Sequence, residues 1–239
     1  MGYVIIARVS GGNSVGSIPT GGRGTEVNRA TDNLDLISQQ IRQNLTAKDA
    51  AREKMLPLCR EAIRCSSEAI RSIHRQEFNK AEGLLESACL LLDEAEQARA
   101  DSTELSNTGF YRDAQKEFVE GNAVLTLVTG KPLPYPGELK VDSAAYLNGL
   151  GEAASELRRY LLDGIRKGDL SQGEELLTAM DDIYSLLVAV DFPDAITGGL
   201  RRTTDMLRGV LERTRSDLTL AIRQKYLEGR LENLEKNLK

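Results

Sequence analysis

From Leu34 onward, apolar residues recur three or four positions apart almost without interruption. This spacing places them on one face of an α-helix, whereas a β-strand would need alternation at every second position. Trp is absent, aromatic residues make up 5% of the chain, and Leu, Ala, Glu, Arg and Lys are abundant, a composition that favours helices over strands. We therefore expect an all-α protein with little or no strand.

The interruptions of this pattern contain residues that start or end helices. The segment 130–138 holds three prolines and cannot stay helical, and Pro193 marks a second break, after which a last long helix should begin near Asp194. Thr46 and Asp49 fit a capping box at the start of a long helix. Six or seven helices joined by short loops predict an antiparallel bundle of about seven helices.

Residues 1–29 differ from the rest of the chain. They hold seven of the 21 glycines and a single acidic residue, and their short apolar stretch lacks the basic segment of a secretory signal. We predict a flexible Gly/Ser-rich tail over 1–29 and one helical domain over 30–239.

Three sequence features limit where the protein acts and what it can bind. No apolar run approaches the roughly 20 residues of a membrane span, so we expect no membrane partner. Cys59, Cys65 and Cys89 form no CxxC pair and have no zinc-site spacing, which predicts free thiols in a cytoplasmic protein. The net charge of -5 argues against a uniformly basic surface, so that any nucleic-acid site must be local.

One candidate for such a local site is a row of basic side chains on one helix face: Arg60, Arg64, Arg71, His74 and Arg75. At 100° per residue the four arginines fall within roughly 60° of one another, so they could bind consecutive phosphates. The alternative is that they form ion pairs with the acids of the same helix, Glu61, Glu68 and Glu77. A lone histidine is also more often structural than catalytic.

Two pairs of carboxylates are the second candidate. Glu117 and Glu120 share one face of the helix predicted from about Ser106 to Thr129, and Glu152 and Glu156 share one face of the next helix. Facing helices that contribute inward glutamates bind hard divalent cations such as Mg²⁺ or Mn²⁺, which assist phosphodiester cleavage. The alternative is that all four acids are solvated surface residues.

Two stretches around these acids resemble the translin family: Gln115-Lys-Glu117-Phe-Val-Glu120-Gly121, and Tyr146-Leu-Asn-Gly149-Leu-Gly-Glu152-Ala-Ala-Ser-Glu156-Leu-Arg158. A fainter likeness extends from about Leu34 to Lys225. Within that family the chain is most similar to the nuclease subunit type, Trax, whose metal site uses the acids of these motifs. The resemblance implies that Glu117, Glu120 and Glu152 are catalytic and bind metal together with Glu156, although Glu152 stands where Trax has Asp.

The resemblance also implies a translin-like bundle that assembles into a hollow homo-octamer. That shell would enclose single-stranded RNA, or DNA as the alternative, and cut it with Mg²⁺ or Mn²⁺, while the basic row lines the interior. Two other functions stay open: a non-catalytic translin-like nucleic-acid-binding oligomer, and a helical scaffold protein.

Overall fold

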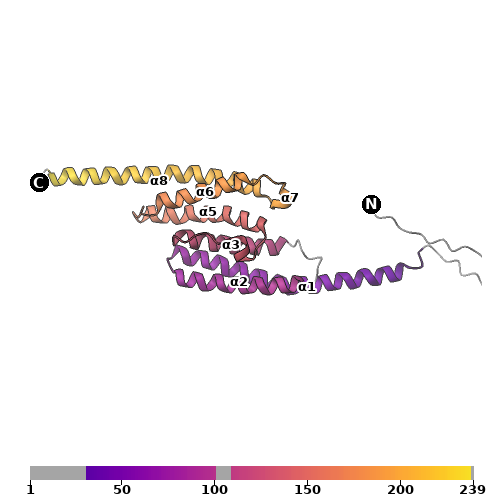
Figure 1. The fold of residues 1–239 in the computed structure, drawn as a ribbon. Helices are drawn as coiled ribbons and strands as arrows, with labels where there is room; N and C mark the ends of the chain where they lie inside the picture. Colours follow the sequence, from indigo (N-terminus) through magenta and orange to yellow (C-terminus); the bar gives the residue numbers. More distant parts are fainter. Residues whose placement is uncertain (1–30, 101–108, 238–239) are drawn as a thin grey trace, which may run out of the picture. The chain divides into compact units, whose positions relative to one another are not determined.

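The computed structural model describes residues 31–100 and 109–237, and every regular element within these ranges is a helix. The helices are α1 (Leu34–His74), α2 (Phe78–Ala100), α3 (Gly109–Val128), α4 (Pro136–Leu139), α5 (Ser143–Arg166), α6 (Gly173–Ala189), α7 (Asp194–Thr197) and α8 (Leu200–Asn237) (Figure 1). The predicted all-α class is confirmed. None of the helices described here is long and apolar enough to cross a membrane. The tail predicted over 1–29 lies outside the described residues.

The chain divides into two compact units, Met1–Arg42 and Gln43–Lys239. The described part of the first unit consists of a turn at 31–33 and the first residues of α1. The second unit contains the remainder of α1 and all the other helices. It carries the core and the candidate site, which are described below.

Two predicted helix boundaries are wrong. Helix α1 already begins at Leu34, so Thr46 and Asp49 lie inside it and form no capping box. The apolar residues that precede Thr46 keep the helical period, so nothing interrupts the helix there. The single last helix expected from Asp194 is instead two helices, α7 and α8, because Gly198 and Gly199 adopt φ values of +63° and +88°. Glycine tolerates this left-handed region, which ends a helix.

The proline-rich segment 130–138 ends α3 as predicted, but it is not wholly irregular. Pro136 occupies the first position of the four-residue helix α4. A proline is favoured there because its missing N–H would have no partner inside the helix. The segment connects α3 to α5, the two helices that carry the acidic motifs.

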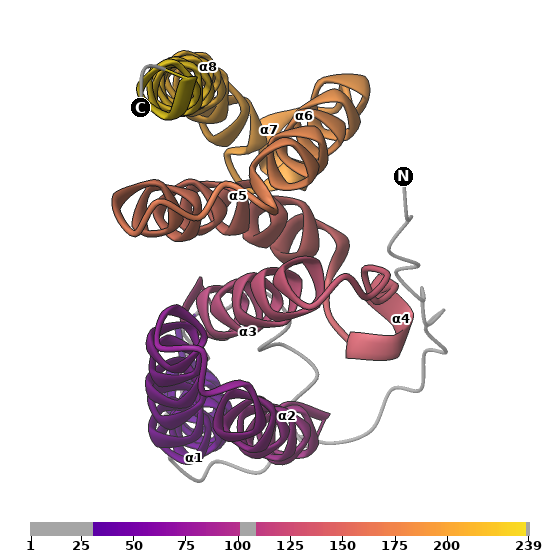
Figure 2. The same ribbon diagram turned by 90° about the vertical axis from the view of Figure 1, so that its left-hand side faces the viewer.

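Helix α3 is central to the second unit. Figure 2 shows α3 with the pair formed by α1 and α2 on one side and α5 on the other. Helices α6 and α8 pack on the opposite side of α5. The backbones of α3 and α5 approach closely at Gly149, where a methyl group would lie 2.7 Å from the carbonyl oxygen of Lys116. This crossing brings the acidic faces of the two helices together.

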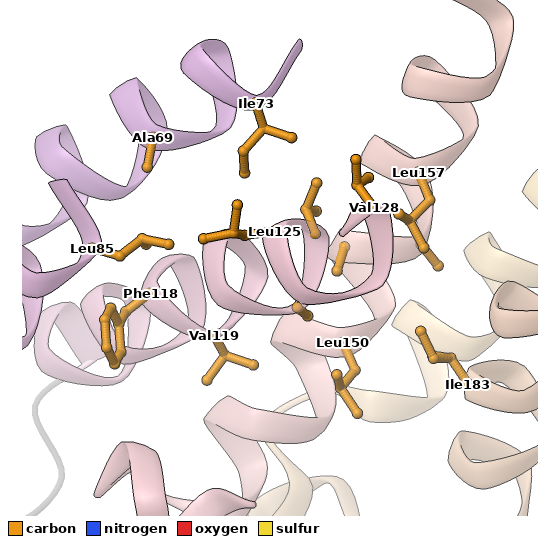
Figure 3. Close-up of a cluster of buried hydrophobic side chains, with 14 of the residues drawn as sticks. Ala69, Ile73, Leu85, Phe118, Val119, Leu125, Val128, Leu150, Leu157 and Ile183 are labelled. Carbon is orange, nitrogen blue, oxygen red and sulfur yellow. The ribbon is translucent and has the colours of Figure 1, made fainter. Parts of the chain in front are cut away.

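A continuous cluster of buried side chains fixes this arrangement. Figure 3 shows Ile73 of α1, Leu85 of α2 and Leu125 of α3 converging, with Val128 of α3 close to Leu157 of α5. Burial of each such side chain stabilises the fold by roughly 1.5–3 kcal/mol. The positions of the polar side chains above this core are therefore set by well-packed helices.

Candidate functional site

Three carboxylates from two helices meet beside the α3–α5 crossing. Glu117 and Glu120 lie one turn apart on α3, and Glu152 of α5 faces them. One carboxylate oxygen from each residue lies within 4.8 Å of the other two. Three oxygens at such separations can converge on one hard divalent cation with only small side-chain movements.

The carboxylates border an open pocket of about 490 Å³. Its lining comes from four helices: Ser67, Ile70, Arg71, Glu117, Glu120, Glu152, Ser155, Glu156, Arg159 and Met206. Glu120 is 8% exposed, and it lies deepest of the three acids of the cluster. The acids therefore line a pocket that a polynucleotide backbone could enter, and they are not solvated residues of an open surface.

Crowding of the carboxylates perturbs their protonation. Burial, followed by repulsion from Glu117, Glu152 and Glu156, raises the pKa of Glu120 to about 8. Burial and the charge of Glu152 also raise the pKa of Glu117. A cation at this position would relieve both effects, so the donor set fits a divalent metal ion.

Lys116 is a component of the site that sequence reasoning missed. Its Nζ atom donates a hydrogen bond to Glu152 Oε1 over 2.8 Å, so an ammonium already neutralises part of the acidic cluster. Burial opposes the charge of Lys116, but the bond to Glu152 and the nearby acids outweigh it and raise the pKa of Lys116. The contact joins α3 to α5. It could not be predicted from the sequence, in which Lys116 is only seen to stand next to Glu117.

Glu156, predicted as a fourth ligand, lies beside the cluster. His74 Nε2 lies 2.7 Å from its Oε2 atom, and Arg159 Nη1 lies 3.6 Å from the same oxygen. The hydrogen bond with His74 is the largest cause that lowers the pKa of Glu156, and charge from His74 and Arg159 adds to it. Glu156 is therefore held as a carboxylate by basic side chains, one helical turn from Glu152.

The structure separates the predicted basic row into different environments. Arg71 lines the glutamate pocket. Arg64 forms ion pairs with Glu61 and Glu68, as the alternative interpretation anticipated. Arg60 is exposed on α1, Arg75 is exposed in the turn that follows α1, and neither is among the residues that line this pocket.

Arg159 was not predicted, although the pattern to find it was present. It follows Glu152 by seven residues and Glu156 by three, so all three share one face of α5. The pocket consequently has arginines from two helices, Arg71 of α1 and Arg159 of α5.

The sequence matches no protein-family model. It is 28% identical over 192 residues to the uncharacterized protein MJ0175 of Methanocaldococcus jannaschii, covering 80% of this chain and 85% of that protein.

Solved structures are similar over most of the chain. A structure of AfC3PO, from Archaeoglobus, in complex with duplex RNA is 35% identical, with a TM-score of 0.72 over 79% of this chain and 97% of that one. The crystal structure of AfC3PO is 34% identical with the same TM-score, and it is covered over 98%. The apo form of NeC3PO, from Nematostella, shares the fold at 18% identity, with a TM-score of 0.67. Identity above 30% over nearly the whole of AfC3PO shows that the chain belongs to the translin family.

Proposed function

We propose that this chain is a Trax-like nuclease that binds RNA and cuts it with a Mg²⁺ or Mn²⁺ ion held by Glu117, Glu120 and Glu152. The observation that carries the proposal is the meeting of these three carboxylates in an open pocket. The structure of the related AfC3PO with duplex RNA supports RNA as the partner. The same pocket could receive a single strand, so the strandedness of the substrate is part of the test below.

The residues present fit a hard divalent cation. Carboxylate oxygens are the donors that Mg²⁺ and Mn²⁺ prefer, and the raised pKa of Glu120 reflects a surplus of negative charge that an ion would compensate. A bound ion would lower the pKa of a coordinated water and stabilise charge on the phosphate under attack. Glu156 stays ionised beside the cluster, where its carboxylate can accept a hydrogen bond from the attacking water.

The arginines of the pocket would position the substrate. Arg71 and Arg159 reach the pocket from α1 and α5, and a guanidinium can donate two parallel hydrogen bonds to one phosphate. Both side chains are exposed, so they can move onto a bound backbone. Phosphate contacts of this kind bind RNA without reading its sequence.

Assembly is the second part of the proposal. Beyond Leu218, α8 presents an apolar row that is more than half exposed: Leu220, Leu227, Leu231 and Leu234. Leu220, Leu227 and Leu234 lie seven residues apart, the spacing of a helix that packs against another helix. We propose that this row contacts other copies of the chain in a homo-octameric shell.

Cleavage of end-labelled RNA by the purified protein tests the catalytic part. Single-stranded and duplex forms of one sequence are compared in Mg²⁺, in Mn²⁺ and in EDTA. Glu120→Gln and Glu152→Gln should each reduce the cleavage rate by at least about 100-fold while RNA binding persists, because each removes an anionic ligand. Glu86→Gln, an exposed glutamate of α2 outside the pocket, should cut like the wild type.

The other outcomes are equally informative. Metal-independent RNA binding without cutting would indicate the non-catalytic translin-like function. A protein that neither binds nor cuts RNA would indicate a scaffold. Cutting that survives both pocket variants would refute the assignment of the glutamates.

A further inference from the structure

Helix α8 forms one side of the glutamate pocket and carries arginines that the proposed mechanism does not use. Met206 is the α8 residue that lines the pocket. Arg202 precedes Met206 by four residues and Arg213 follows it by seven, so at 100° per residue all three lie within about 40° of one another around the helix. The face of α8 that borders the glutamates is therefore basic.

Hydrogen bonds between α5 and α8 fix the positions of these arginines along the pocket. Thr203 Oγ1 donates to Asn148 Oδ1 over 2.7 Å, and Arg158 Nη1 donates to Thr214 Oγ1 over 3.2 Å. The two helices consequently run in the same direction, and each bonded threonine directly follows one of the two arginines in the sequence. Glu152 lies between Asn148 and Arg158 on α5, so one arginine precedes its level along α8 and the other follows it.

The positive charges of both arginines are uncompensated. The two side chains are exposed, and neither forms an ion pair within the described ranges of the chain. Arg215 of the same helix is instead paired with Asp181 over 3.0 Å. The guanidinium of Arg213 lies back along the helix toward Met206, with Nη1 3.3 Å from the position that a Cβ atom on Gly209 would occupy. An unpaired guanidinium keeps its five N–H donors for an anion.

The same face of α8 changes its chemistry along the helix. Counting back by sevens from Leu234 through Leu227 and Leu220 leads to Arg213 and then to Met206. The leucines lie in the stretch of α8 that contributes no buried residue to the core, whereas the arginine lies where the helix passes the glutamates. An apolar face suits contact with another helix, but exposed guanidinium groups suit an anionic polymer.

We infer that Arg202 and Arg213 form a second phosphate-binding wall of the pocket, which holds the RNA backbone on both sides of the glutamates. The inference rests on the proposed function and extends it, because Arg71 and Arg159 reach the pocket from α1 and α5 only. Eleven residues of helix separate the two α8 arginines, a rise of about 16 Å. One strand of a duplex carries a phosphate roughly every 3.4 Å of its axis, so several consecutive phosphates fit this length.

The salt dependence of RNA affinity tests the inference without cleavage. Full-length wild type, Arg202→Gln and Arg213→Gln are each titrated into a fluorescently labelled oligouridylate in EDTA, and anisotropy is measured at several concentrations of potassium chloride. A phosphate contact on a single strand contributes about 0.7 to the slope of log affinity against log salt. Each variant should therefore reduce the slope by about 0.7 and weaken binding about fivefold at roughly 0.1 M salt.

Arg208→Gln is the matched control. Arg208 belongs to the same helix, is exposed and has no ion pair in the part of the chain that the structure describes. It follows Met206 by two residues, so it lies about 160° away around the helix. Its replacement removes the same charge from the protein, yet affinity should fall less than about twofold and the salt slope should stay at the wild-type value. All three variants should keep the thermal midpoint and the elution volume of the wild type in gel filtration.

Three results would overturn the inference. The first is a wild-type salt slope in both Arg202→Gln and Arg213→Gln. The second is an equal loss of affinity in Arg208→Gln, which would show an effect of net charge alone. The third is a changed elution volume of the two variants, which would place the arginines in a contact between copies. A wild type that binds no RNA would refute the proposed function as well, whereas RNA binding with an unaltered slope in both variants would refute this inference alone.

Discussion

Replacing Glu120 by glutamine should make the metal-free protein more stable at neutral and alkaline pH. The wild-type carboxyl is buried beside two other acids, and its pKa is raised from an ordinary 4.5 to about 8. Between these values the folded protein retains a proton that the unfolded chain releases. Stability is therefore fully present below pH 4.5 and is lost as pH rises through about 8.

The size of the loss follows from the distance between the two pKa values. Each unit corresponds to ~1.4 kcal/mol, so the free energy of unfolding falls by roughly 3 kcal/mol at pH 7 and by about 5 kcal/mol above pH 8. Glutamine has nearly the same shape and stays neutral, so Glu120→Gln should lack this contribution. Titrating groups outside the acidic cluster are common to both proteins and cancel in the comparison.

Denaturant unfolding in EDTA at pH 5, 7 and 9 measures the effect. The stability difference between Glu120→Gln and wild type should grow by several kcal/mol from pH 5 to pH 9, whereas Glu86→Gln should follow the wild-type curve. Parallel curves for wild type and Glu120→Gln would refute the reasoning, because Glu120 would then titrate alike in the folded and unfolded states.

Two further predictions concern the neighbours of Glu152. Gly149→Ala should lower stability by about 1–3 kcal/mol in thermal denaturation, since the added methyl would lie 2.7 Å from a backbone oxygen of α3 that cannot rotate away. Gly83→Ala of α2, with nothing within 4 Å, should instead stabilise by up to about 1 kcal/mol, and equal effects at both sites would contradict the packing argument. Lys116→Met should tighten Mn²⁺ binding roughly fivefold or more, because it removes an ammonium group that is bonded to the proposed ligand Glu152. Weaker Mn²⁺ binding in calorimetry would contradict this and show that Lys116 supports the site.

Much of the fold could be predicted because its cause is local. The three- and four-residue period of apolar residues from Leu34 onward specifies helices. The prolines of segment 130–138 prevent a helix from continuing through that segment, whatever the tertiary structure. The capping box at Thr46 failed because a cap motif has meaning only where a helix starts, and the preceding residues already continue α1. Gly198 and Gly199 were overlooked as a helix break although paired glycines favour one.

The site was only partly accessible to sequence reasoning. Spacing along each helix placed Glu117 with Glu120, but the approach of Glu152 depends on the crossing at Gly149. The bond from Lys116 to Glu152 spans 36 residues, and the bond from His74 to Glu156 spans 82. Such partners follow from the packing of helices and not from local patterns, so the engagement of Glu156 by His74 could not be foreseen.

Mn²⁺ binding at equilibrium tests the central claim most directly, because it asks whether the three glutamates form a metal site at all. We predict saturable binding to the wild type and to Glu86→Gln, displaced by Mg²⁺, measured by electron paramagnetic resonance of free Mn²⁺ near pH 8. The same titration of Glu120→Gln and Glu152→Gln should show affinity reduced by at least about tenfold. Equal Mn²⁺ affinity in the wild type and both pocket variants would contradict the account.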